Sequence, residues 1–174
     1  KRQEFDLVKT KNLLLDYSKT IKMPNAKVKL SLNKHGDIRL DHEQVEIKEQ
    51  GSVVSLKLAN HPIDATNKFY FHKTSFWDEL FPERSLSYLQ DVIYYNHAGE
   101  ITETSRANLA FEKDGVLYTP PINCGLLAGT YRQFLVDKGE MIERKIHMSE
   151  IHYFDHIYTI NSVRGKLLAT LIPK

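Results

Sequence analysis

The N-terminal part of the chain carries two patterns of apolar positions. Between Phe5 and Ile21 apolar residues recur every three to four positions, which predicts an amphipathic helix. One stripe of this helix is expected to hold Leu7, Leu14, Tyr17 and Ile21. Pro24-Asn25 should end it. Residues 27–32 then alternate strictly between polar and apolar, which indicates a half-buried strand before a turn at residues 35–37.

A change of pattern near residue 51 divides the chain. A polar stretch covers residues 43–51, and more apolar, strand-like runs follow it. We therefore expect a domain boundary at Gln50-Gly51, with a small domain at residues 1–51 and a larger one at residues 52–174. The chain begins at Lys1 without an initiator methionine, so a segment upstream of the small domain is expected.

The larger domain is predicted to be rich in strands. Strands are expected at residues 52–58, 68–72, 92–95, 101–111, 116–118, 156–160 and 166–172. Helices are expected at residues 78–89, 130–138 and 149–154, and Asp114-Gly115 is a strong hairpin signal. Long runs of strands with segregated helices favour an α+β fold over alternating βαβ units.

Composition narrows the class of protein. Of the 174 residues 41% are hydrophobic and 26% are charged, as in an ordinary globular protein. The 24 Lys+Arg nearly balance the 22 Asp+Glu, so neither a nucleic-acid partner nor a membrane surface is expected. The one cysteine, Cys124, lies among apolar residues, which favours a buried thiol and a cytoplasmic setting. The eight histidines form no metal-ligand pattern, so no metal site is expected.

The first candidate for chemistry is Lys73, which follows the aromatic run Phe69-Tyr70-Phe71-His72. A lysine in an apolar surround has its charged form disfavoured, and its amine can then form a Schiff base. By itself, however, the pattern favours a solvated lysine at the end of a strand over a lysine that forms a Schiff base.

A second candidate, Glu103, is expected on the same strand face as Ile101, whereas Glu100 beside the turn is expected to be solvated. A carboxylate on an inward face needs a partner. Either a protonated pyridine nitrogen or an arginine, such as Arg106 or Arg132, could serve. Without other information a structural ion pair is the better interpretation.

Two further segments could hold an anion. Gly129 directly precedes a predicted helix start at Thr130-Tyr131, where free backbone N–H groups and the helix dipole attract negative charge. Ser162 lies in a polar run between two apolar strands and could donate its hydroxyl to a phosphate. A plain glycine turn explains the segment at Gly129 about equally well, whereas a run such as that around Ser162 is more often only a turn.

In this order and spacing, the four segments resemble the fold-type IV pyridoxal-phosphate (PLP) enzymes, the class IV aminotransferases and aminodeoxychorismate lyases. Thirty residues separate Lys73 from Glu103, and a hairpin, a Leu-x-Gly loop and an Asn-Ser turn follow. The resemblance covers the chain from Ser52 to its end, and it implies that the small N-terminal domain at residues 1–51 is incomplete.

The resemblance implies a role for each matching residue. Lys73 would bind the cofactor covalently and move the substrate proton, and Glu103 would hold the pyridine nitrogen protonated. Leu127 would pack on the ring, and Asn108 would brace the strand under it. The phosphate would be held by the helix start that follows Gly129, at Thr130 and Tyr131, and by Ser162.

The segment Phe69–Thr74 is similar to that of the lyase branch of the family. This implies elimination of pyruvate from 4-amino-4-deoxychorismate to give 4-aminobenzoate for folate synthesis. The alternative is an aminotransferase for D-amino or branched-chain amino acids, and a more distant one is a non-catalytic remnant of the fold. The family resemblance also implies an amino-acid-like substrate and a homodimer.

Overall fold

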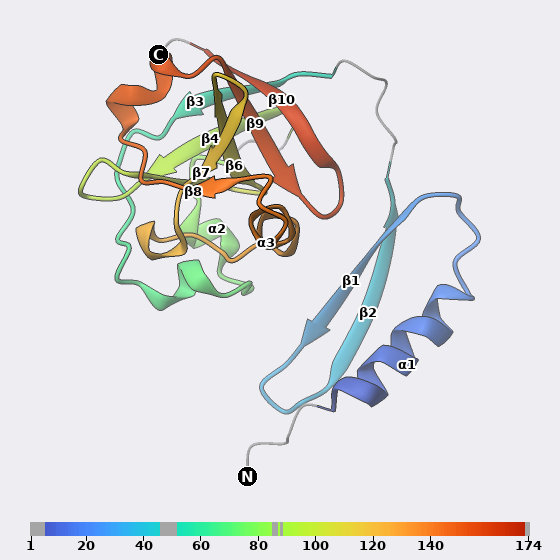
Figure 1. Cartoon of the computed structure of the whole chain (residues 1–174). Helices are drawn as coiled ribbons and strands as arrows, with labels where there is room; N and C mark the ends of the chain where they lie inside the picture. The colour runs from blue at the N-terminus through green and yellow to red at the C-terminus, as the bar shows by residue number, and fades with distance from the viewer. Residues whose placement is uncertain (1–5, 46–51, 85–86, 88, 173–174) are drawn as a thin grey trace. The chain divides into compact units, whose positions relative to one another are not determined.

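The computed structural model describes residues 6–45, 52–84, 87 and 89–172 (Figure 1). The chain divides into two compact units, residues 1–49 and residues 50–174. The expected boundary at Gln50-Gly51 lies outside the described residues.

The N-terminal unit is one helix and one hairpin. Helix α1 (Leu7–Ser18) begins at Asp6, whose carboxylate accepts a hydrogen bond from the Lys9 N–H at 2.9 Å. Strands β1 (Ala26–Leu32) and β2 (Ile38–Gln44) are antiparallel, in the register that pairs Leu30 with Leu40. The helix, the first strand and the turn are confirmed. Strand β2 was not predicted, and it extends into the polar stretch as far as Gln44, because it pairs along its whole length with β1.

In the C-terminal unit, the described residues include eight strands that form one mixed sheet in the order β5-β4-β3-β10-β9-β6-β7-β8. The strands are β3 (Val54–Leu58), β4 (Gln90–Tyr95), β5 (Ile101–Thr104), β6 (Asn108–Lys113), β7 (Val116–Thr119), β8 (Ile142–Glu143), β9 (His156–Asn161) and β10 (Gly165–Leu171). Strand β3 is parallel to both its neighbours, and β7 is parallel to β8. The main core cluster includes the fully buried side chains of Leu56, Ile93, Ile101, Leu109 and Phe111.

Local signals predicted two of the connections correctly. The β6–β7 hairpin turns at Asp114 and Gly115, whose φ angles of 51° and 76° are those of a type I′ turn. Helix α3 (Thr130–Asp137) begins after Gly129 and ends before Gly139, which has a φ of 71°.

The predicted strand over residues 101–111 is two strands, which the residues between Thr104 and Asn108 separate. The Thr104 hydroxyl and N–H both donate to the Ala107 carbonyl, at 3.0 and 2.9 Å, and the Ala107 N–H donates back to the hydroxyl. These bonds close a tight turn that periodicity alone does not show. The turn directs β5 and β6 to different places in the sheet.

The segment before Lys73 is helical rather than extended. The predicted strand at residues 68–72 is a 3-10 helix, η1 (Lys68–Phe71), because the Asn67 side chain accepts a hydrogen bond from the Phe69 N–H. The helix expected at residues 78–89 is the single turn α2 (Trp77–Leu80), which ends before Pro82.

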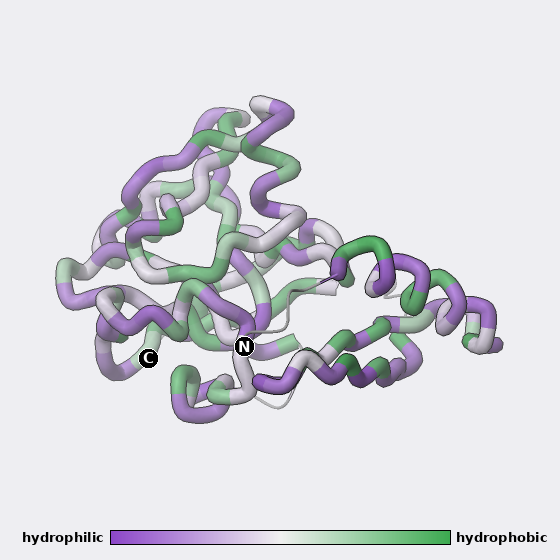
Figure 2. Tube along the Cα trace, turned by 90° about the horizontal axis from the view of Figure 1, so that it is seen from below, coloured by the Kyte–Doolittle hydropathy of each residue, from purple (hydrophilic) through white to green (hydrophobic). Residues whose placement is uncertain are grey.

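Two other 3-10 helices, η2 (Ile122–Cys124) and η3 (Met148–Tyr153), complete the described elements, and η3 replaces the helix expected at residues 149–154. Hydrophilic and hydrophobic segments are interspersed along the chain in Figure 2. Within the residues described, no helix is long and apolar enough to span a membrane.

Candidate active site

The buried carboxyl group of Glu103 is the centre of the site. Glu103 lies on β5 with 3% of its surface exposed. Its Oε1 accepts a hydrogen bond from the Leu127 N–H at 3.0 Å, and its Oε2 accepts one from the Asn108 side-chain amide at 3.1 Å. The expectation that Glu103 faces inward is therefore confirmed. Both carboxyl oxygens have a donor within the protein.

The environment of Glu103 favours its protonated form. Burial raises the pKa of Glu103 to about 8, and the negative charge of Asp91 adds to this effect. The Leu127 N–H and the positive charges of Lys73 and Arg132 act in the opposite direction. The carboxyl group can therefore carry and share a proton near neutral pH.

The structural ion pair expected for Glu103 is not formed. Among the described residues, no lysine, arginine or histidine makes a salt bridge with this carboxyl group. Arg132 pairs with Glu143 instead, and Arg106 donates to the Ser87 carbonyl at 2.8 Å. Neither of the two arginines considered as partners of Glu103 therefore forms an ion pair with it among the described residues.

Asn108 connects Glu103 to the loop that precedes α3. Its side-chain amide also donates to the Leu127 carbonyl at 2.9 Å, so both backbone polar groups of Leu127 are held by the pair Glu103 and Asn108. The Leu127 side chain is half-buried. A β-carbon on Gly129 would lie 2.1 Å from the Asn108 side-chain oxygen, so only glycine permits this approach.

The start of α3 lies directly beside this pair. Gly129 is the N-cap residue and has no side chain to cap the helix, so the first-turn N–H groups of Thr130 and Tyr131 face outward from the loop. Thr130 is exposed and Tyr131 is half-buried. A helix start without a side-chain cap can bind an anion through its N–H groups, and Thr130 and Tyr131 remain the predicted phosphate-binding positions.

Ser162 approaches the same end of the sheet through strand pairing. Asn108 pairs with Ile160 across β6 and β9, and Ser162 is exposed in the turn that follows β9. The Asn161 side chain shapes this turn by accepting hydrogen bonds from the N–H groups of Val163 and Arg164, at 3.0 and 2.9 Å.

Lys73 lies in the surroundings that its own sequence pattern favoured, those of a solvated lysine. The side chain is exposed rather than enclosed by apolar residues, because it lies in the irregular segment between η1 and α2. Its Nζ lies 5.6 Å from the centre of the Trp77 ring, and its charge lowers the proton affinity of Glu103. Lys73 and Glu103 therefore interact electrostatically although 30 positions separate them in the sequence.

Glu100 is another correction. It was expected to be solvated, but only 20% of its side chain is exposed. It pairs with Lys145 at 2.7 Å and accepts a hydrogen bond from the Asn96 amide at 2.9 Å. Cys124 is buried as predicted, and burial raises the pKa of its thiol to about 12, which makes it an unreactive residue.

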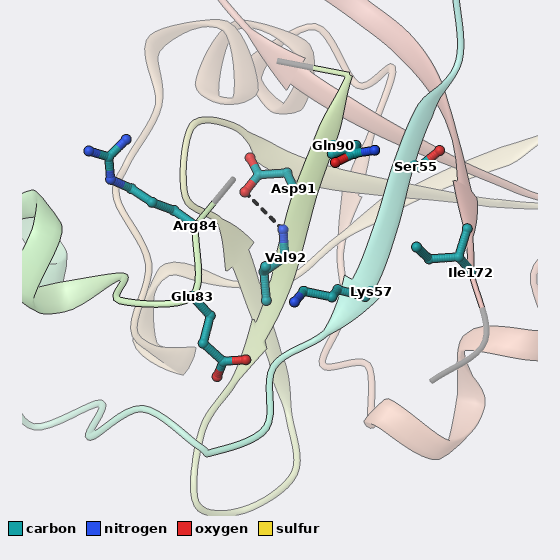
Figure 3. Close-up of a pocket in the computed structure, with 8 residues that line it drawn as sticks. All are labelled: Ser55, Lys57, Glu83, Arg84, Gln90, Asp91, Val92 and Ile172. Atoms are coloured by element: carbon teal, nitrogen blue, oxygen red, sulfur yellow. Dashed lines mark hydrogen bonds between the residues drawn. The ribbon is translucent and has the colours of Figure 1, made fainter. Parts of the chain in front are cut away.

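Sequence reasoning missed Asp91, a buried carboxylate on β4. Its Oδ1 accepts hydrogen bonds from the Ser105 hydroxyl at 2.7 Å and from the Val92 N–H at 2.8 Å. Asp91 also lines a hollow of about 330 Å³, together with Lys57, Glu83 and other residues (Figure 3). Neither Glu103 nor Lys73 lines this hollow. In the sequence, Asp91 is a single acidic residue at the start of a strand, and nothing in such a pattern indicates its role.

Comparison with known proteins identifies the family. Residues 40–172 match the family described as amino-transferase class IV. The chain belongs to the class IV aminotransferase family. This family is a class of PLP-dependent enzymes that includes aminotransferases and lyases, and the expected fold is confirmed.

Three individual relatives are informative. A candidate aminodeoxychorismate lyase of Schizosaccharomyces pombe is 44% identical over 54 residues, which are 31% of this chain and 23% of that protein. A candidate amino-acid aminotransferase of Mesorhizobium loti is 28% identical, with a TM-score of 0.88 over 98% of this chain and 84% of that one. An aminotransferase of Brucella abortus bound to PLP has a TM-score of 0.76 at 14% identity over 97% and 69% of the two chains, and shows the fold alone. The curated relatives are thus matched over well under two thirds of their length.

The protonation of Glu103 predicts how the stability of the cofactor-free protein depends on pH. The pKa of this group is raised on folding from 4.5 to about 8, so its contribution to the free energy of unfolding is complete below about pH 4.5 and is lost as the pH rises toward 8. The slope is at most about 1.4 kcal/mol per pH unit. Urea denaturation at several pH values between 5 and 8 measures it.

Glu103→Gln should remove this part of the slope, because its amide does not titrate. Glu79→Gln, which removes an exposed carboxylate from α2, controls for the loss of one negative charge. Equal slopes in the wild type and in Glu103→Gln would contradict the buried, protonated state.

Gly129→Ala tests the close approach of the loop to Asn108. The new methyl group would displace the Asn108 amide and should reduce the free energy of unfolding by about 1–3 kcal/mol. Because Asn108→Ala removes the atom that the methyl group meets, the double variant should be less destabilised than the sum of the two single variants. Thermal or urea unfolding of the four proteins measures the coupling, and simple additivity would argue against the contact.

Proposed function

We propose that this chain binds PLP at the site formed by Lys73, Glu103 and the start of α3. The observation that carries the proposal is the buried carboxyl group of Glu103, which has two protein donors and a pKa raised to about 8. A carboxyl group in that state suits a pyridine nitrogen, with which it can share a proton. The interaction of Lys73 with Glu103 supports an amine on the same side of the site.

The remaining residues fit the other parts of the cofactor. A phosphate dianion suits the N–H groups of Thr130 and Tyr131 at the start of α3, and the Ser162 hydroxyl would add a donor. The half-buried Leu127 side chain would cover one ring face. Asn108 would keep the loop and the Glu103 carboxyl group in register through its two hydrogen bonds.

Each residue would then have a definite task. When bound, PLP supplies an electron sink for charge that develops on the α-carbon of an amino-acid-like substrate. Lys73 would hold the cofactor through Nζ and would remove the proton from that carbon, the step with which both elimination and amino transfer begin. Glu103 would keep a proton at the ring nitrogen.

We favour a lyase that eliminates pyruvate from 4-amino-4-deoxychorismate and leaves 4-aminobenzoate. The support is the 44% identical segment of the Schizosaccharomyces pombe protein. A class IV aminotransferase acting on D-amino or branched-chain amino acids is the second candidate, and the similarity to the Mesorhizobium loti protein along 98% of this chain favours it. A homodimer in the cytoplasm belongs to the same proposal, on the ground of the family resemblance.

A pair of assays separates the two reactions. With PLP present, we expect pyruvate and 4-aminobenzoate from 4-amino-4-deoxychorismate, and no amino transfer from D-alanine or leucine to 2-oxoglutarate. Lys73→Ala should lower the rate by about 10²–10⁴-fold, because it removes the group that moves the proton. Lys68→Ala, an exposed lysine of the same segment, is the matched control and should keep the activity.

Amino transfer without pyruvate release would replace the lyase proposal with the aminotransferase. A cofactor-loaded protein that is inactive in both assays would contradict both reactions and leave the non-catalytic alternative.

A further inference from the structure

The proposed chemistry makes no use of Trp77, the one tryptophan of the chain. Its ring is half-buried and packs on Phe81 with ring centres 4.6 Å apart. Its indole N–H donates a hydrogen bond to the Ser105 carbonyl, and Lys73 Nζ lies 5.6 Å from the ring centre. An ammonium group at that distance from an indole ring is within the range of a cation–π contact.

The partner of the indole is itself held in place. Ser105 is fully buried and lies two positions after Glu103. Its hydroxyl and its N–H both donate to Asp91 Oδ1, at 2.7 and 3.3 Å, and Asp91 has 6% of its surface exposed. A continuous series of contacts therefore leads from β4 through Asp91 and Ser105 to Trp77, and from its ring to Lys73.

Lys73 needs such a contact more than an enclosed lysine would. Its side chain is exposed and has a long, flexible stem, so rotation about the bonds of that stem can move Nζ. Reaction with a cofactor held at Glu103 and α3 requires the amine at a defined place, and a misplacement of about 1 Å can slow a reaction by about 100-fold.

We propose that Trp77 is a positioning residue, whose indole, fixed to Ser105, holds Lys73 Nζ on the side of the site where Glu103 lies. This inference rests on the proposed PLP site. It assigns Asp91 and Ser105 the task of keeping the indole in place. A purely structural role of Trp77, as a member of the aromatic cluster around Phe81, is the alternative that the experiment must separate from it.

The test compares covalent and non-covalent binding. PLP has an aldehyde that Lys73 can attack, whereas pyridoxamine phosphate lacks the aldehyde and binds without a bond to Lys73. Trp77→Phe keeps an aromatic ring but removes the N–H donor to Ser105. We expect this variant to attach PLP about 10- to 100-fold more slowly, as followed by absorbance, with an unchanged Kd for pyridoxamine phosphate. Phe76→Leu, an exposed neighbour that packs on Phe69, is the matched control and should change neither quantity.

The possible results distinguish a failure of the positioning role of Trp77 from a failure of the proposed PLP site. Attachment at the native rate in Trp77→Phe would overturn the positioning role, and so would an equal weakening of pyridoxamine phosphate binding, because a structural role predicts it. If the native chain binds neither compound, the proposed cofactor site fails. In that case the emission of Trp77 in the free protein still tests the contact: Lys73→Met should change it, whereas Lys68→Met should not, and an unchanged emission in Lys73→Met would overturn the contact itself.

Discussion

The burial of one carboxyl group organises this site. Glu103 lies on a strand that is covered on both faces, and two hydrogen-bond donors from later parts of the chain reach its oxygens. Burial raises the pKa of Glu103 to about 8, although the nearby charges of Lys73 and Arg132 act in the opposite direction. Burying a carboxyl group costs stability unless hydrogen bonds or a partner charge compensate for it. Groups whose pKa is shifted in this way are frequent at functional sites.

The other parts of the site are arranged around the same group. Asn108 joins Glu103 to the backbone of Leu127, and its side-chain oxygen lies so close to Gly129, the N-cap of α3, that a β-carbon there would meet it. The pairing of β6 with β9 adds the turn that carries Ser162. Family membership and the fold agree with a PLP enzyme, while Lys73, on an exposed segment, depends on its contact with Trp77 for a defined position.

Features with local causes could be predicted from the sequence, and those with distant causes could not. The Asp114-Gly115 hairpin and the start of α3 follow from turn and capping preferences, and alternation placed Glu103 on an inward face. The polar strand β2 depends on pairing with β1, and the break after Thr104 depends on side-chain bonds within one turn. The link from Trp77 to Ser105 joins residues 28 positions apart, which no local pattern reveals.

Lys73 is the proposed attachment point of PLP, in a site where the buried carboxyl group of Glu103 would face the ring nitrogen. Borohydride reduction of the PLP-treated protein makes the bond to the lysine permanent, and peptide mass mapping then locates it. We expect one modified lysine, Lys73, at close to one cofactor per chain, with little modification in Lys73→Ala. Modification spread over many surface lysines, or none at Lys73, would contradict it.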